Sequence, residues 1–283
     1  MQEVIRAILL GVVQGATEFI PVSSSGHLVI IPWLFGWEIP PDITLLMDTV
    51  LHWGTLLSIM LVFWRDFLAM IVACWRSLFS RSLADVNARI GWFIVLGSIP
   101  TAVVGLAFKD FFETLFVSST VGPLAAGISL LITAAVLSGS ELLVRNAEAP
   151  RTLSDMNVKD AIAIGIAQSF ALLPGLSRSG VTIAAGLVRK LRRDAAARFS
   201  FMLGTPAFLG AGLLQMIEST STDADLVMLY APAIMAGFVA SAITGYFAIR
   251  FLLAYLRRRN LYIFAVYCTV VGIGVILLSL YRA

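Results

Sequence analysis

The stretch that decides the fold is "QGATEFIPVSSSGHLVI", residues 14–30, in which a carboxylate, three serines and a histidine interrupt an apolar run. The residues on either side are apolar almost throughout, from "AILLGVV" before the stretch to "IPWLFGW" after it. A charged group in the middle of such a run is expensive at membrane depth unless it belongs to a functional site. We therefore interpret this polar break as half of a site.

The composition indicates an integral membrane protein. Of the 283 residues, 59% are hydrophobic and 13% are charged, whereas ordinary soluble domains have about 25% charged residues. The apolar runs are long and rich in Leu, Ile, Val, Ala and Phe, without the alternation of an outer-membrane barrel. The predicted fold class is an all-α polytopic membrane protein. We expect no cleavable signal peptide.

Six segments are long enough to cross a bilayer of about 30 Å. They cover residues 47–64, 90–108, 121–144, 195–216, 226–249 and 261–281. Two further regions, 3–36 and 158–188, are longer than one span and are interrupted by Pro, Gly and Ser. We predict that both are re-entrant helical hairpins, whose irregular backbone is tolerated where protein or a wet cavity satisfies it. The segment 67–80 is too short and too interrupted to be another span and is predicted to be a cytoplasmic interfacial helix.

The two interrupted regions are copies of each other at an offset of 154 residues. The matched pairs are Gly11 and Gly165, Gln14 and Gln168, Ser23 and Ser177, Ser25 and Ser179, and Gly26 and Gly180. Each copy contains one hairpin and three spans, and an odd number of spans inverts the second copy. We predict a single membrane domain, 1–283, with repeat one at about 1–145 and an inverted repeat two at about 155–283.

Charge predicts the orientation, because Lys and Arg accumulate in cytoplasmic loops. If both hairpins return to the side from which they enter, sixteen of the 20 basic residues fall on one side. The other side receives Arg6, Lys109 and Arg282, while Arg178 lies inside a hairpin. This split predicts that both termini lie outside and that the basic loops are cytoplasmic. The runs "RKLRR" and "RRR" are interpreted as topology signals that also contact anionic lipids.

The first break combines groups that suit anion chemistry. Gln14 and Glu18 lie four residues apart and share one helical face. Pro21 ends the first half-helix, and the serines at 23–25 begin the next, where they cap the helix and its positive end binds an anion. His27 lies three residues after Ser24, near enough to exchange a proton with the same ligand. The structural alternatives are a packing role for Gln14 and a buried core role for His27.

The second break, "LLPGLSRSGVT" at 172–182, has the same pattern of a proline followed by capping serines, with Arg178 at the position equivalent to Ser24. The planar fork of arginine suits bidentate phosphate binding, and the alternative is a structural salt bridge from Arg178 to Glu18. If the repeats meet, the site accepts a phosphorylated ligand whose remainder is lipid. Asp48 and His52 lie four apart and are placed at the mouth of the same cavity, unless one of them extends to the interface.

The sequences of the two polar breaks resemble the signature motifs of a known protein family. "QGATEFIPVSSSGH" resembles the (E/Q)xxxE and PVSSxGH signature, and "PGLSRSGVT" the PGxSRSGxT signature, of bacterial undecaprenyl-pyrophosphate phosphatases associated with bacitracin resistance. The resemblance covers essentially the whole chain. It implies hydrolysis of undecaprenyl pyrophosphate to undecaprenyl phosphate and inorganic phosphate at the bacterial inner membrane, which recycles the carrier lipid for peptidoglycan synthesis. It also implies an interlocked inverted-repeat fold with an active site open to the periplasm.

The resemblance assigns roles to individual residues. The family motifs carry over onto Glu18, Ser24, His27, Ser177 and Arg178. The predicted catalytic set is Glu18, Ser24, His27 and Arg178. Together with the helix starts, the resemblance predicts phosphate binding by a second set: Ser23, Ser25, Gly26, Ser177, Ser179, Gly180 and Thr182. It also implies a divalent cation, Mg²⁺ or Ca²⁺, held by Glu18 and Gln14. Because Gln14 is an amide at the first acidic position, a two-carboxylate cation site is in doubt unless Asp48 contributes.

Two mechanisms remain open. Ser24 is our preferred nucleophile with His27 as its proton acceptor, and the rival makes His27 the nucleophile or the activator of a water molecule. A different class of function is also open, because inverted repeats with broken helices build transporters, so the chain could flip the polyprenyl phosphate across the membrane. The expected partners are the lipid pyrophosphate and membrane lipids, together with a second copy in a homodimer. No nucleic-acid partner is expected.

Overall fold

The computed structural model describes residues 1–108, 122–145, 150–218 and 224–282. Its elements within these ranges are helices, in the order α1 (Gln2–Phe19), α2 (Ser24–Phe35), α3 (Pro41–Ser80), α4 (Val86–Ala107), α6 (Gly122–Val144), the short 3₁₀ turn η2 (Leu153–Asp155), α7 (Val158–Phe170), α8 (Arg178–Val188), α9 (Arg193–Glu218), α10 (Ala224–Leu256) and α11 (Tyr262–Arg282). The predicted all-α class is confirmed.

Within the described ranges, six helices are long and apolar enough to cross a membrane. They are α3, α4, α6, α9, α10 and α11, and each coincides with one of the six predicted spans over all of that span or all but one of its residues. The chain is therefore a multi-pass membrane protein by length and composition of its helices. The first residue of the predicted third span, 121, and the basic residue Lys109 lie outside the described residues.

The segment 67–80 is helical, as predicted, and lies beyond a kink that divides α3 into two helices. Its predicted place at the cytoplasmic interface stays a prediction. Helix α3 continues through this segment to Ser80, and the change of direction occurs at Phe63, whose backbone angles are not helical (φ −109°, ψ 15°). Residues 67–80 contain neither Gly nor Pro. Nothing in this stretch stops a helix once it has begun, so the charges at Arg65 and Asp66 do not end it.

Both interrupted regions are helix–break–helix units. Helix α1 ends at Phe19, and the preference of the residue before a proline for extended backbone places Ile20 at ψ 129° ahead of Pro21. Helix α7 ends at Phe170, several residues before Pro174, and the connection contains Gly175 at φ +80°. Both breaks are followed by a short apolar helix, α2 or α8.

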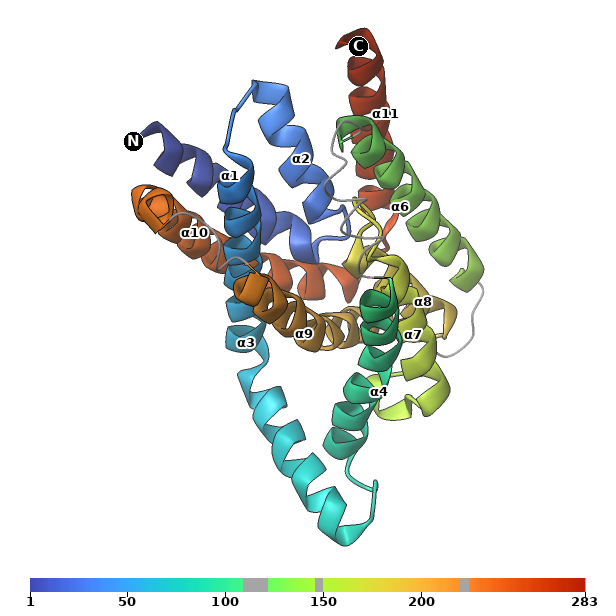
Figure 1. Cartoon of the computed structure of the whole chain (residues 1–283). Coiled ribbons are helices and arrows are strands. Elements are labelled where there is room, and N and C mark those ends of the chain that lie inside the picture. The colour runs from blue at the N-terminus through green and yellow to red at the C-terminus, as the bar shows by residue number, and fades with distance from the viewer. Residues whose placement is uncertain (109–121, 146–149, 219–223, 283) are drawn as a thin grey trace.

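Each broken unit packs against a span from the other half of the chain. Helix α1 lies along α10, α7 lies along α4, and α6 lies along α11 (Figure 1). Glycines allow the backbones to touch: a Cβ atom at Gly11 would collide with the carbonyl of Gly237, and one at Gly165 would collide with the carbonyl of Gly97. The two halves are therefore intertwined and not set side by side.

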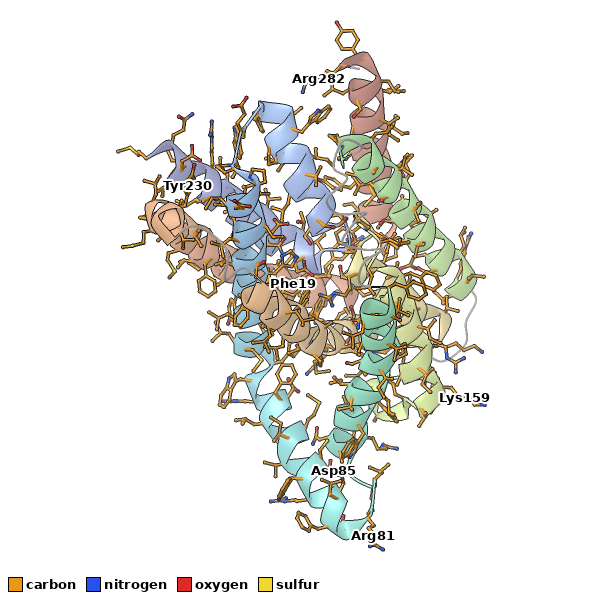
Figure 2. The ribbon with its side chains drawn as sticks, in the orientation of Figure 1. Phe19, Arg81, Asp85, Lys159, Tyr230 and Arg282 are labelled. Carbon is orange, nitrogen blue, oxygen red and sulfur yellow. The ribbon has the colours of Figure 1, made fainter. Side chains whose placement is uncertain are left out.

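The centre of this bundle is apolar and contains the breaks. Phe19, the last residue of α1, is fully buried and meets the ring of Phe201 edge-on at 5.2 Å. Figure 2 shows Phe19 near the middle of the molecule, with Arg282 at one end and Arg81 and Asp85 at the other. The polar residues next to Phe19 thus lie at mid-depth in the bundle.

Candidate active site

At the first break, the side chain of Ser23 caps helix α2 and contacts the second break. This residue is the N-cap of α2 at φ +71°, and its Oγ accepts a hydrogen bond from the N–H of Gly26 at 3.2 Å. The same hydroxyl donates to the carbonyl oxygen of Gly175 at 2.7 Å. Because Gly175 belongs to the second break, the two repeated motifs touch directly across 152 residues of sequence. A positive φ at a non-glycine residue is strained, and such strain concentrates at functional sites.

The second break repeats the same cap at the equivalent positions. Ser177 is the N-cap of α8, and its Oγ accepts from the N–H of Gly180 at 3.1 Å. The N–H of Ser177 donates to Oγ1 of Thr133 on α6 at 3.3 Å. Serine caps are favoured because they satisfy one of the free N–H groups at a helix start. Both half-helices therefore begin where the sequence predicts, at 24 and at 178.

Glu18 is the charged centre between the two breaks. Its Oε1 accepts from Nη2 of Arg178 at 2.9 Å, and the side chains are 4% and 13% exposed. Its Oε2 accepts from Nε2 of Gln14 at 3.1 Å and from Oγ of Ser24 at 2.6 Å. Nε2 of His52 lies 3.6 Å from the same oxygen. A buried carboxylate with these partners has its charge compensated, which is the condition for keeping it at membrane depth.

Arg178 is held by one face of α9. Its Nη1 donates to the carbonyl oxygen of Ser200 at 2.9 Å, and its guanidinium lies over the ring of Phe208 at 4.6 Å. Gly204, one turn from each of these residues, leaves room for the guanidinium, because a Cβ atom there would collide with it. The buried Nε has no hydrogen-bond partner among the described residues. The arginine is thus fixed in direction and keeps a donor for a further ligand.

His27 is engaged by neither Ser24 nor Glu18. Its Nδ1 is 2.7 Å from the carbonyl oxygen of Ser23, and its Nε2 is 2.8 Å from the hydroxyl of Tyr267 on α11. The hydroxyl of Ser24 faces Glu18 instead. The structure therefore brings Gln14, Glu18 and Ser24 together with Arg178, and places His27 beside them on a separate pair of partners.

The remaining predicted phosphate-binding residues line the starts of α2 and α8. Ser25 is half-buried on the first turn of α2, and Oγ of Ser179 is 3.3 Å from Oγ of Ser177. Thr182 is fully buried, and its hydroxyl contacts Oγ of Ser200 at 2.6 Å and the carbonyl oxygen of Arg178 at 2.8 Å. Thr182 therefore ties α8 to α9, and its predicted phosphate contact stays a prediction.

The donor set for a divalent cation is partial. Gln14 Oε1 is buried with no hydrogen-bond partner among the described residues, and it belongs to the residue whose Nε2 bonds Glu18. Asp48 contacts the site through its carbonyl oxygen, which accepts from Nδ1 of His52 at 2.7 Å. In the described part of the chain, no three His, Cys, Asp or Glu side chains form a cluster that would enclose a metal. One carboxylate and one free amide oxygen suit a cation that takes its other ligands from phosphate oxygens.

Sequence reasoning missed three contributors to the site. The carbonyl of Ser200 and the ring of Phe208 bind Arg178, and Tyr267 binds His27. The first two carry no motif, because a backbone carbonyl and an apolar ring leave no signal in an apolar helix. Tyr267 did leave one, since it places a phenolic hydroxyl inside the predicted span 261–281.

Known proteins match nearly the whole length of this chain. The model of the family described as bacitracin resistance protein BacA matches residues 7–274. A protein of Methanosphaera stadtmanae named undecaprenyl-diphosphatase is 43% identical over 289 residues, covering 99% of both chains. One of the same name from Desulforudis audaxviator is 41% identical over 277 residues, covering 98% of both chains. The matched range includes both polar breaks, and the chain is therefore a member of the BacA family of bacitracin resistance proteins.

Proposed function

We propose that this protein is a membrane phosphatase that hydrolyses undecaprenyl diphosphate to undecaprenyl phosphate and inorganic phosphate. Its curated relatives are named for this activity. The observation that carries the proposal is the ion pair between Glu18 and Arg178, because it joins both polar breaks in one charged centre within an apolar bundle. Recycling of the carrier lipid for peptidoglycan synthesis, and with it bacitracin resistance, follows from this reaction and from the family.

Phosphate binding falls to the two helix starts and to Arg178. The N-termini of α2 and α8 carry free N–H groups and the positive ends of their helix dipoles. The buried Nε of Arg178 supplies a further donor. Oxyanion stabilisation by such fixed donors is the largest contribution to phosphoryl transfer in a water-poor site. The contact from Ser23 to Gly175 supports this arrangement, since it keeps the two starts together.

Ser24 is the nucleophile in the mechanism that we favour. Its hydroxyl already donates to Glu18 Oε2 at 2.6 Å, so the proton passes to that carboxylate as Oγ attacks the terminal phosphorus. A bond from Oγ to phosphorus forms, and the anhydride bond to the departing undecaprenyl phosphate breaks. Water then attacks the phosphoserine, with Nε2 of His27 as the acceptor of its proton, while Glu18 returns a proton to Oγ of Ser24 and inorganic phosphate leaves. His27 as nucleophile has less support, because both of its ring nitrogens are hydrogen-bonded.

Glu18 and Gln14 would hold a divalent cation, Mg²⁺ or Ca²⁺, together with oxygens of the diphosphate. The free buried Oε1 of Gln14 beside the Glu18 carboxylate supports this assignment. When bound, the cation supplies positive charge that neutralises phosphate oxygens. The chain's own contribution is to present one carboxylate and one amide oxygen from a single helical face of α1.

The proposed function is tested by phosphate release from purified protein in detergent. A polyprenyl diphosphate is supplied, with and without a chelator, and inorganic phosphate is measured. We expect release by the wild type, loss in Glu18→Gln and Arg178→Ala, and restoration of chelator-treated protein by Mg²⁺ or Ca²⁺. A flippase of the lipid phosphate would release no phosphate, so absence of release from well-folded wild type overturns the proposal. Full activity in chelator overturns the cation assignment alone.

We further propose that 3–36 and 158–188 are re-entrant hairpins within inverted repeats, as the sequence predicts. The reciprocal packing supports this: α1 of the first half lies on α10 of the second, and α7 of the second half lies on α4 of the first. Equivalent serines, at 23 and 177, cap both short helices. This arrangement points both half-helix starts toward the middle of the membrane.

The same arrangement supports an inner-membrane protein with both termini in the periplasm and the site open to that side. Figure 1 has both chain ends toward one end of the bundle, and Figure 2 has Arg81 and Lys159 away from it. The basic loops then face the cytoplasm. We also propose a homodimer.

A further inference from the structure

The side chain of His27 is held from two directions. The residue is 6% exposed, and its ring lies between the backbone of its own helix start and α11. Nδ1 is 2.7 Å from the carbonyl oxygen of Ser23, and Nε2 is 2.8 Å from the hydroxyl of Tyr267. The rings of His27 and Tyr267 also stack, with centroids 5.7 Å apart and planes 13° apart. The imidazole is therefore fixed in position and in plane.

These two contacts determine where the imidazole carries its proton. A carbonyl oxygen can only accept a hydrogen bond, so Nδ1 of His27 must carry a hydrogen. In the neutral ring Nε2 is then the acceptor, and the Tyr267 hydroxyl donates to it. If the ring gains a proton at Nε2, the same hydroxyl can accept from it, because a phenol both donates and accepts. The Tyr267 hydroxyl can therefore hydrogen-bond His27 in both protonation states, and the ring gains or loses its proton at Nε2 alone.

A second contact ties α11 to the same break. Sγ of Cys268, the next residue after Tyr267, lies 3.9 Å from the carbonyl oxygen of Pro21, and this cysteine is fully buried. Two neighbouring residues of α11 therefore meet the first polar break, one at its proline and one at its histidine. Helix α11 has no part in either sequence motif, so its contribution to the site arises from tertiary packing.

We propose that Tyr267 is a positioning residue of the phosphatase, which fixes the plane of the His27 ring by stacking and shares a hydrogen bond with its Nε2, while the Ser23 carbonyl keeps the proton on Nδ1. This inference rests on the proposed function for its kinetic consequence. The contact between Tyr267 and His27 can be tested without measuring activity. Tyr267 acts through His27 and needs no contact with the lipid. The residue is 42% exposed, so part of it lies at the surface of the bundle.

The contact is tested by nitrogen NMR of the histidine rings. The chain has 2 histidines, so ¹⁵N-histidine labelling gives two ring systems, and the spectrum of His27→Gln shows which one is His27. At about pH 8 the imidazole is neutral. We expect Nδ1 to be protonated in the wild type, and we expect Tyr267→Phe to move the Nε2 signal toward that of a free lone pair. Unchanged His27 signals in Tyr267→Phe, or a proton on Nε2 in the wild type, overturn the proposal.

The kinetic test separates the hydroxyl from the ring. Tyr267→Phe keeps the stacking and loses one hydrogen bond, so we expect kcat for phosphate release to fall about 3- to 10-fold with KM within about 2-fold. Tyr281→Phe is the matched control, since Tyr281 lies on the same helix and is 88% exposed, and its rate should stay at the wild-type value. Wild-type kcat in Tyr267→Phe overturns the positioning role. If the wild type releases no phosphate, the proposed function fails, and the NMR result still decides the contact.

Discussion

At the scale of single residues, Glu18 is the point on which the site depends. It binds Arg178 through one oxygen, and Gln14 and Ser24 through the other. Removal of one partner of a buried ion pair leaves the other charge uncompensated. The pair therefore has a structural consequence as well as a chemical one, and the two can be separated by experiment.

We expect Glu18→Gln to lower both stability and activity. Breaking the buried pair with Arg178 should cost about 3–5 kcal/mol, which thermal unfolding in detergent would record as a lower midpoint. The double variant Glu18→Gln with Arg178→Gln removes both charges and should recover most of that stability without recovering phosphate release. Recovery of activity in the double variant, or equal stability of the single variant and wild type, would contradict this account.

Ser24→Ala tests the nucleophile. Removal of an attacking oxygen should reduce phosphate release by roughly 10³-fold or more. The cap at Ser23 is kept, so the stability cost is limited to the lost hydrogen bond to Glu18, about 1.5–3 kcal/mol. The assay compares initial rates of wild type, Ser24→Ala and the half-buried neighbour variant Ser25→Ala. Activity of Ser24→Ala within a few-fold of wild type would end the serine mechanism and favour His27 or water.

Helical spacing predicted some contacts of these residues and could not predict others. Gln14 and Glu18 lie four apart on one helix, and their hydrogen bond follows from that spacing. Ser24 and His27 share a turn of α2, yet Ser24 bonds Glu18 across the break and His27 bonds Tyr267 on α11. Periodicity describes one helix at a time, and it carries no information on the direction that the chain takes through a break.

At the scale of elements, close helix crossings replace the hydrophobic effect, which is weak between helices in lipid. The backbone of α7 meets that of α4 where Gly165 faces Gly97, and α6 meets α11 where Gly127 faces Gly272. Small residues at such points let the helices approach and gain dispersion contacts. The position of Gly165, equivalent to Gly11 in the first repeat, follows from the same requirement in both halves.

We expect Gly165→Leu to destabilise the protein by separating α4 from α7. Forcing a side chain into a filled crossing typically costs about 1–3 kcal/mol, which would lower the unfolding midpoint. Gly139→Leu is the matched control, because a side chain at Gly139 of α6 meets open space. The measurement is the thermal unfolding midpoint of both variants in the same detergent. Equal midpoints would mean that close packing at Gly165 does not contribute to stability.

Element boundaries were predicted less well than element identity. The predicted span 47–64 lies inside α3, which runs from Pro41 to Ser80. Hydropathy reports the part of a helix that suits the hydrocarbon core, whereas a helix ends where a cap, a glycine or a proline stops it. The two breaks were located closely because Pro21 and the capping serines at 23 and 177 carry those stop and start signals.

At the scale of the whole molecule, the repeat in the sequence explains why distant segments meet. Helices α1 and α7 contain the matched residues of the two interrupted regions, and each packs on a span from the other half of the chain, α10 or α4. Such an exchange brings the starts of α2 and α8 together, as the hydrogen bond from Ser23 to Gly175 illustrates. The sequence predicted that the two motifs would converge, but the partners contributed by α9 and α11 needed the packed structure.

The proposed orientation predicts which side of the membrane each end of α3 faces. In a background lacking Cys74 and Cys268, a cysteine replacing Arg81 at the α3–α4 turn should react with a membrane-impermeant maleimide only after the cells are opened. One replacing Glu38, between α2 and α3, should react in intact spheroplasts. Because α3 separates the two positions and Lys and Arg accumulate in cytoplasmic loops, the two labels must appear on opposite sides. Labelling of both from one side would contradict the span of α3, and the reverse order would contradict the proposed orientation of the chain.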